Sequence, residues 1–141
     1  MTMKPLQTDI EVGPFKYGGS GVVYLSRYTN NGKFSKVAVL VLDPETGERV
    51  LTVSANVPTL PLPVDHLLVK DYSENQGVLD VFVDAGLLEK TGDSHIIDYG
   101  THKIELPICS FTGKLQEAYE RFVEQNRESN TDQTEEDFPN V

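Results

Sequence analysis

Short apolar runs separated by turn signals dominate the first half of the chain, a pattern typical of antiparallel strands. Residues 22–28 and 37–42 are rich in β-formers and flank the tight-turn signal Asn30-Asn31-Gly32, so we predict a hairpin. Proline and glycine within residues 43–47 predict a second turn, after which residues 49–55 resume a β-rich run. The pattern therefore predicts three consecutive antiparallel strands.

Prolines mark the segments on either side of these strands. Residues 1–14 contain Pro5 and Pro14, which favours an extended entry or an edge strand. Residues 57–63 contain three prolines, which remove backbone donors, so we expect an extended and partly buried crossover there. A short strand is predicted at residues 66–70.

Two further strands are predicted towards the C-terminus. The sequences Thr91-Gly92-Asp93 and Tyr99-Gly100-Thr101 are typical of turns and bracket strands at residues 94–97 and 102–109. Pro107 interrupts the second strand, which favours a position at the edge of a sheet.

Helical signals occur twice. Ser73 and Gln76 have capping-box spacing and predict a helix start, and Gly86 after Ala85 predicts its left-handed end. This helix would bury Leu79, Phe82 and Val83, with Leu87 and Leu88 beneath it. Thr112 is the predicted cap of a second helix over residues 113–127, whose buried stripe comprises Leu115, Ala118, Tyr119, Phe122 and Val123.

Together these elements predict an α+β fold with an antiparallel sheet of five or six strands and two helices packed on one face. The length of 141 residues and a hydrophobic content of 38% predict one domain, which we place at residues 1–128. Residues 129–141 are polar and acidic without periodicity, so we expect a disordered acidic tail.

Charge narrows the choice of partner. The chain carries −10, of which residues 115–141 hold −6 through eight acids and two arginines. An acidic chain repels phosphate backbones, so we expect no direct contact with nucleic acid. The same charge favours a basic protein partner, such as a nucleic-acid-binding protein.

The sequence also indicates a location. No stretch approaches the roughly 18 uninterrupted apolar residues of a membrane span, and the N-terminus lacks an apolar signal region. The single cysteine, Cys109, cannot form an internal disulfide. We therefore expect a soluble cytoplasmic protein without membrane contact.

Three patterns were weighed as sites and interpreted as structural. The glycine-rich residues 17–21 lack the Gly-Lys-Ser/Thr ending and following helix of a phosphate loop, which favours a turn or bulge before a strand. The histidines and Cys109 lack zinc-site spacing, and Cys109 lies in an apolar run where an inert thiol is expected; the residues weighed for a metal were His66, His95, His102, Asp98 and Cys109. Asp80 and Asp84 fit an exposed helix face. No cofactor, metal or catalytic residue is predicted.

The sequence from Lys70 to Gly77, followed by Ala85-Gly86-Leu87 and Thr91-Gly92, carries a family resemblance. Over residues 57–111 the chain resembles an uncharacterised family of small acidic proteins of bacteria, phages and conjugative elements. The resemblance implies a mobile-element setting and no mechanism. Within the signature, we expect the exposed residues before the helix to contact a protein partner: Asp71, Tyr72, Glu74 and Asn75.

These observations favour a non-enzymatic interaction protein of a phage or mobile element that binds and modulates a host protein, for example as a counter-defence inhibitor. One alternative is a domain that sequesters or senses a small molecule, with the glycine loop and Pro-rich crossover lining a pocket. Another is a structural, homo-oligomeric accessory protein. An enzyme is disfavoured because no nucleophile, base and orienting group can be assembled from the spacing.

Overall fold

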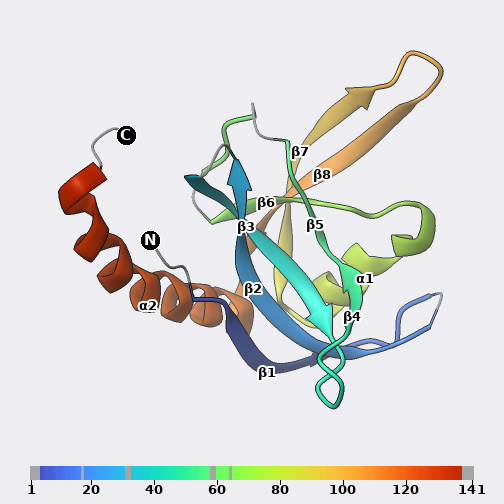
Figure 1. The fold of residues 1–141 in the computed structure, drawn as a ribbon. Helices are drawn as coiled ribbons and strands as arrows, with labels where there is room; N and C mark the ends of the chain where they lie inside the picture. Colours follow the sequence, from blue (N-terminus) through green and yellow to red (C-terminus); the bar gives the residue numbers. More distant parts are fainter. Residues whose placement is uncertain (1–3, 17, 31–32, 58–59, 64, 138–141) are drawn as a thin grey trace.

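The computed structural model describes the backbone of residues 4–16, 18–30, 33–57, 60–63 and 65–137. These residues form two four-stranded antiparallel sheets and two α-helices (Figure 1). The first sheet has the order β1-β2-β3-β4 and the second the order β5-β6-β8-β7. The elements are β1 (Leu6–Val12), β2 (Gly21–Asn30), β3 (Lys33–Leu42), β4 (Arg49–Thr52), β5 (Ser54–Ala55), β6 (His66–Val69), the 3-10 turn η1 (Ser73–Asn75), α1 (Val78–Asp84), β7 (Leu88–Asp98), β8 (Lys103–Phe111) and α2 (Gly113–Asp137).

The α+β class is confirmed, but the prediction of one sheet with five or six strands is wrong. The hairpin of β2 and β3 and its antiparallel neighbour β4 form as predicted, and β1 lies at the edge of the same sheet. Residues 49–55, however, divide between the sheets, because β4 pairs with β3 whereas β5 pairs with β6. The turn residues 31 and 32 lie outside the described residues.

The division occurs at a hydrogen-bonded corner formed by Val53 and Ser54. The N–H of Val53 donates to the carbonyl of Val39 at 2.8 Å, and its carbonyl accepts from the N–H of Lys70 at 2.7 Å. The Ser54 Oγ accepts from the N–H of Val39 at 2.9 Å and lies 2.8 Å from the Tyr28 hydroxyl. A side-chain oxygen thus takes a backbone donor of β3, so the chain changes sheet without leaving that donor unpaired.

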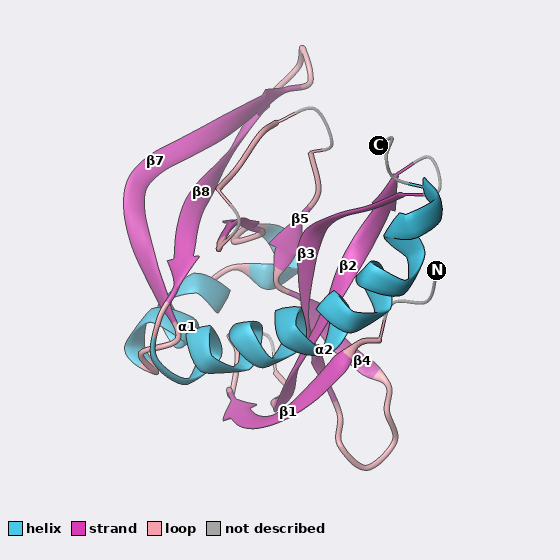
Figure 2. Cartoon of the chain, turned by 90° about the vertical axis from the view of Figure 1, so that its left-hand side faces the viewer, coloured by secondary structure: helices cyan, strands magenta, loops and turns pink. Residues whose placement is uncertain are grey.

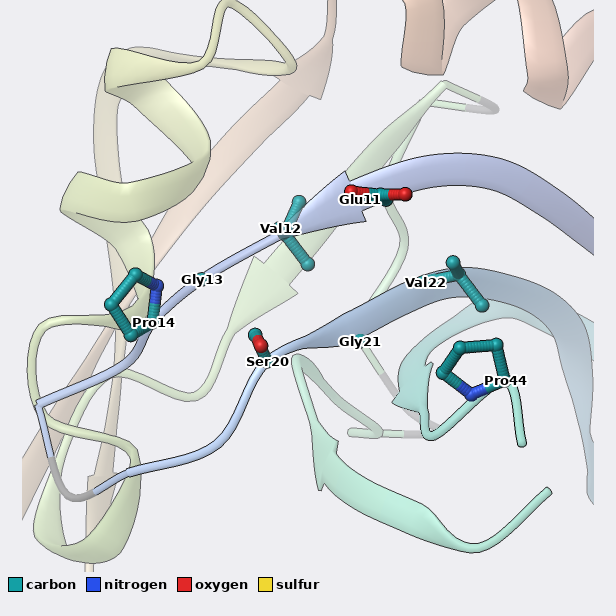
Figure 3. A pocket seen from close by; sticks show the side chains of 8 residues that line it. All are labelled: Glu11, Val12, Gly13, Pro14, Ser20, Gly21, Val22 and Pro44. Atoms are coloured by element: carbon teal, nitrogen blue, oxygen red, sulfur yellow. The ribbon is translucent and has the colours of Figure 1, made fainter. Parts of the chain in front are cut away.

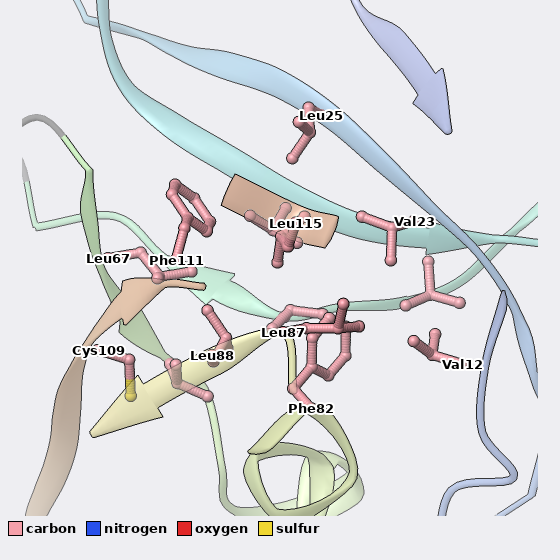
Figure 4. Close-up of a cluster of buried hydrophobic side chains, with 14 of the residues drawn as sticks. Val12, Val23, Leu25, Leu67, Phe82, Leu87, Leu88, Cys109, Phe111 and Leu115 are labelled. Atoms are coloured by element: carbon pink, nitrogen blue, oxygen red, sulfur yellow. The ribbon is translucent and has the colours of Figure 1, made fainter. Parts of the chain in front are cut away.

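Both sheets and both helices contribute to a single hydrophobic core (Figure 4). Val23 and Leu25 enter it from β2, Phe82 from α1 and Leu115 from α2, and Leu87 lies between α1 and β7. The predicted burial of Leu79, Phe82, Leu87 and Leu88 is confirmed, and Val83 is partly buried against the core. The left-handed backbone of Gly86, with a φ of 74°, is also as predicted.

The second sheet departs from prediction at two places. Thr91-Gly92-Asp93 is not a turn but an irregularity within β7, where the register against β8 shifts and Gly92 has a φ of 94°. Such a bulge uses the same residue types as a turn. β8 is not an edge strand, because it lies between β6 and β7. Pro107 is accommodated because it stands just beyond the last β6–β8 pair, Leu68 with Ile108.

The predicted stripe of α2 is buried from Leu115 to Phe122, and Val123 is partly buried against the core. Asn126 attaches the same helix to the backbone of Lys4. The Asn126 Oδ1 accepts from the N–H of Lys4 at 2.7 Å, and its amide donates to the Lys4 carbonyl at 2.9 Å. The Thr112 hydroxyl does not cap α2, since it donates to the carbonyl of Gly86. The backbone of α2 continues to Asp137, ten residues beyond the predicted end, so residues 129–137 are helical, and residues 138–141 lie outside the described residues.

Removing the Phe122 ring tests the inward face of α2. Phe122 is fully buried in the core, so Phe122→Ala should lower the free energy of unfolding by about 3–5 kcal/mol through lost transfer energy and a cavity. Urea denaturation measures this loss. Glu117→Ala, on the exposed face, should change it by less than about 0.5 kcal/mol. Equal effects of the two changes would contradict the orientation of α2.

A double-mutant cycle at Ser54 and Tyr28 tests the corner. Ser54→Ala leaves the buried N–H of Val39 without its acceptor, so we expect a loss of about 1–3 kcal/mol in the free energy of unfolding. Tyr28→Phe removes the hydroxyl that lies 2.8 Å from the Ser54 Oγ and donates to the Ser54 carbonyl at 3.1 Å. The two changes should be non-additive by at least about 0.5 kcal/mol, as expected for residues in one hydrogen-bond network. Strict additivity in urea denaturation would show that the two hydroxyls act independently.

Candidate functional site

The loop before α1 carries the predicted contact residues, and its geometry differs from the capping-box prediction. The Asp71 Oδ1 accepts from the backbone N–H of Gly77 at 2.9 Å and of Leu79 at 3.2 Å. Asp71 therefore caps α1, where a carboxylate also complements the positive end of the helix. The prediction that Ser73 is the cap is wrong: Ser73 is exposed in η1 with a φ of 57°, and α1 begins five residues later.

The other predicted contact residues are not gathered on one open face. Asn75 is only 3% exposed, and its amide donates to the carbonyl of Thr52 at 2.6 Å, which ties the loop to β4. Tyr72 is partly buried, and the side chain of Glu74 lies outside the described part of the structure. Asp71 and Asn75 thus hold the loop in place through contacts within the fold.

A shallow groove of about 460 Å³ lies beside the glycine-rich loop (Figure 3). Glu11 supplies its carboxylate and Ser20 its hydroxyl, while the rest of the lining is glycine, proline and valine. The described residues of the Pro-rich crossover, 57 and 60–63, which were expected to line a pocket with this loop, do not line the groove. Two backbone hydrogen bonds close this loop. The N–H of Phe15 donates to the carbonyl of Gly19, and the N–H of Gly18 donates to the carbonyl of Phe15. The predicted glycine turn before a strand is confirmed, since β2 begins at Gly21.

The glycines around this groove are explained by close packing. A Cβ at Gly13 would lie 2.5 Å from the Ser20 Cβ, and one at Gly21 would collide with the carbonyl of Leu42. Because two backbones approach each other here, only glycine fits at these positions. Their presence therefore does not point to a phosphate ligand.

Cys109 is a buried thiol in the core. Burial is the main cause that raises its pKa to about 11, from an ordinary value of 9.0, and Asp71 adds to the rise while Lys90 opposes it. A raised pKa keeps the thiol protonated and poorly nucleophilic at neutral pH. His66 pairs with Ser110 in the β6–β8 register, so its side chain points to the opposite face of the sheet from Cys109. His66 is therefore not placed to act as a base for Cys109.

The described residues contain neither a cluster of metal-ligating side chains nor a membrane-spanning helix. Across the described ranges, no three side chains of His, Cys, Asp or Glu gather to hold a metal ion. Within the same ranges, no helix is long and apolar enough to cross a bilayer.

The feature that sequence reasoning missed is a projecting β-arm, which we define as residues 94–107. It is the far end of the β7–β8 hairpin, and it extends away from the body in both views (Figures 1 and 2). β6 pairs only with residues 108–110 of β8, so the strands of the β-arm pair with each other alone. Its exposure follows from a length mismatch, because β6 has four residues whereas β7 has eleven and β8 nine.

The β-arm carries the exposed apolar side chains. Ile96 is 56% and Tyr99 55% exposed, and they are the large hydrophobic residues most open to solvent in the described part of the chain. The Tyr99 ring stacks on the His102 ring with centroids 5.0 Å apart. The Asp98 carboxylate accepts from the N–H of Gly100 at 2.8 Å and closes the turn. The tip is therefore a preformed aromatic surface, which is a common contact element in protein interfaces.

The sequence contains a signal for one strand of the β-arm. Residues 103–106 alternate polar and apolar side chains, which predicts a strand that is apolar on one face. Leu106 on that face is buried, whereas Ile96 lies on the opposite face and is exposed. The sequence does not show that β6 is too short to pair with the far end of the hairpin.

Comparisons with known proteins add no assignment. Searches against protein-family models, curated proteins and solved structures found no match to this chain. The resemblance over residues 57–111 accordingly stays an expectation.

Comparing Asp71→Ala with Ser73→Ala tests which residue caps α1. Asp71→Ala should lower the free energy of unfolding by about 1 kcal/mol, because two N–H groups at the helix start lose their acceptor. Asp71→Asn retains an acceptor oxygen and should recover most of the loss. Ser73→Ala should change the value by less than about 0.5 kcal/mol. If urea denaturation gives the larger effect for Ser73→Ala, the cap is assigned to the wrong residue.

Proposed function

We propose that this chain is a non-enzymatic interaction protein that binds and modulates a host protein through the tip of the β-arm. The observation that carries the proposal is the projection of a two-stranded arm with Tyr99 stacked on His102 at its end. Tyrosine and other aromatic residues supply much of the binding energy of protein interfaces, because they bury large areas at little entropic cost. A solvent-exposed, stacked aromatic pair needs no chemistry of its own to act in this way.

Charge supports a basic partner. The net charge of −10 steers association with a positively charged protein, and nucleic-acid-binding proteins offer such surfaces. The resemblance to proteins of phages and conjugative elements supports a host protein as the target and inhibition of a host defence as the outcome.

The tip also fits this role better than the loop before α1. Asp71 and Asn75 use their side chains inside the fold, so a partner that engaged them would compete with the cap of α1 and the bond to Thr52. Tyr99 and His102 make their ring contact with each other and remain exposed. A partner can therefore cover them without disturbing the core.

Site-specific photo-crosslinking tests the contact. A photoreactive phenylalanine analogue replaces Tyr99 in one variant, Tyr72 in a second and Glu117 in a third, and each is irradiated in a lysate of the organism that encodes the chain. We expect the Tyr99 probe to give a discrete protein adduct that excess wild-type protein suppresses, and the Glu117 probe to give none. The adduct is identified by mass spectrometry.

The identified partner then allows a quantitative test. Tyr99→Ala should raise the Kd roughly 30-fold, the effect of losing a hot spot of about 2 kcal/mol, whereas Glu117→Ala should leave it unchanged. A specific adduct only at Tyr72 would instead place the contact in the loop before α1.

Removal of residues 129–141 should mainly reduce the association rate at low salt, because long-range attraction is screened as ionic strength rises.

A further inference from the structure

β7 forms an open edge of the β-arm. The pairing of β7 with β8 determines which backbone N–H and C=O groups of β7 point outward from this edge. The N–H of Tyr99 donates to the carbonyl of His102 at 2.9 Å, so these two residues form a hydrogen-bonded pair. Hydrogen-bonded pairs alternate along an antiparallel ladder. In the regular register from Asp98↔Lys103 to Ser94↔Pro107, the N–H and C=O groups of Ser94, Ile96 and Asp98 therefore point away from β8.

The position of Pro107 is consistent with this assignment of inward and outward backbone groups. Pro107 pairs with Ser94 and has no N–H, and the assignment directs its nitrogen away from β7, where no donor is required. β7 is the last strand in its sheet, and no described backbone group outside β8 bonds to its residues 94–98. Three donors and three acceptors of this strand consequently face outward.

The side chains along this edge suit pairing with an identical strand. If two β7 strands align antiparallel about a two-fold axis at Ile96, Ile96 faces its counterpart and Ser94 faces Asp98 of the second copy. Every outward N–H and C=O of the three residues then has a partner, which gives six hydrogen bonds. No like charges oppose each other, and Ile96, which is 56% exposed, packs on the second copy's Ile96.

Two other alignments of the same edge, centred on Asp98 and on Ser94, are disfavoured. A two-fold axis at Asp98 would place two carboxylates directly opposite each other, which destabilises a strand pair. An axis at Ser94 would extend the pairing into residues 91–93, where the β7 register is irregular. On the β8 edge, an axis at Lys103 or at Glu105 would place like charges opposite each other, and Pro107 lacks a donor.

We infer that this chain forms a symmetric homodimer by antiparallel pairing of the β7 edges, centred on Ile96. The product is a continuous four-stranded sheet, in the order β8-β7-β7-β8, across the two copies. The inference goes beyond the proposed function, because it concerns the strand edge and not the Tyr99–His102 tip. It requires no other protein, so it is tested with the purified chain alone.

Sedimentation velocity of the full chain measures the dimer. We expect reversible dimerisation that is detectable at protein concentrations up to about 1 mM, the weak end of specific association. Ile96→Lys places two cations face to face and should abolish the dimer. Glu117→Ala, on the exposed face of α2, is the control and should leave the Kd within about twofold, because it lies on neither strand of the β-arm. Circular dichroism and urea denaturation verify that each variant is folded.

Charge at residue 94 tests the register itself. Ser94→Asp opposes Asp98 of the second copy at two symmetric places and should raise the dimer Kd roughly 2- to 30-fold, since each cross-strand pair contributes about 0.2–1 kcal/mol. Ser94→Lys should lower the Kd by a similar factor. Because the Ser94 hydroxyl donates to the Glu105 carboxylate of its own chain at 2.6 Å, both changes are made in a Glu105→Gln background, where the charge at residue 94 meets the Asp98 carboxylate of the second copy without that neighbour.

Two outcomes would overturn the inference. One is a wild-type chain that remains monomeric at about 1 mM, even if the β-arm binds another protein. The other is a dimer whose Kd does not respond to Ile96→Lys or to the charge at residue 94, which would place the interface elsewhere. Neither outcome affects the Tyr99 crosslinking result, so the two proposals fail independently.

Discussion

The buried hydroxyl of Ser54 is the interaction on which the two-sheet architecture depends. A strand can leave one sheet and enter another only if the donors it abandons find new acceptors, because an unpaired buried N–H is costly. Ser54 supplies such an acceptor to Val39 and holds the Tyr28 hydroxyl beside it. Val53, fully buried next to it, bonds to β3 on one side and to Lys70 on the other. The corner therefore sets the relation of the two sheets, between which the core lies.

The corner also determines what the second sheet can cover. β5 has two residues and β6 four, so the second sheet begins with short strands and ends with long ones. The surplus length of β7 and β8 has no strand to lie against and becomes the β-arm. The exposure of Ile96 and Tyr99 follows from this mismatch of strand lengths.

Sequence reasoning succeeded where a pattern is local and periodic. The stripe of Leu115, Ala118, Tyr119 and Phe122 was predictable because helical periodicity brings these residues to one face regardless of the rest of the fold. The hairpin of β2 and β3 was predictable because turn residues separate two β-rich runs. Gly86 could be recognised as a helix end because few other residues adopt its backbone conformation.

It failed where long-range contacts select among locally reasonable options. Ser73 and Gln76 have the spacing of a capping box, yet the Asp71 carboxylate accepts the hydrogen bond at the start of α1. The 3-10 turn η1 and the left-handed Gly77 bring the helix start close to Asp71. Residues 49–55 have one strand-like pattern throughout, and only pairing partners far along the chain divide them. The β-arm follows the same logic, since its apolar residues suggest a covered strand until the short β6 is known.

The attachment of Asn126 to Lys4 and the projection of the β-arm give the molecule two distinct ends. The attachment holds the start of the chain against α2, while the β-arm extends from the other side of the body (Figures 1 and 2). A fusion or surface anchor attached near residue 4 would thus leave the arm facing solution. The same polarity lets one chain be tethered at one pole while its opposite pole remains free to engage other molecules.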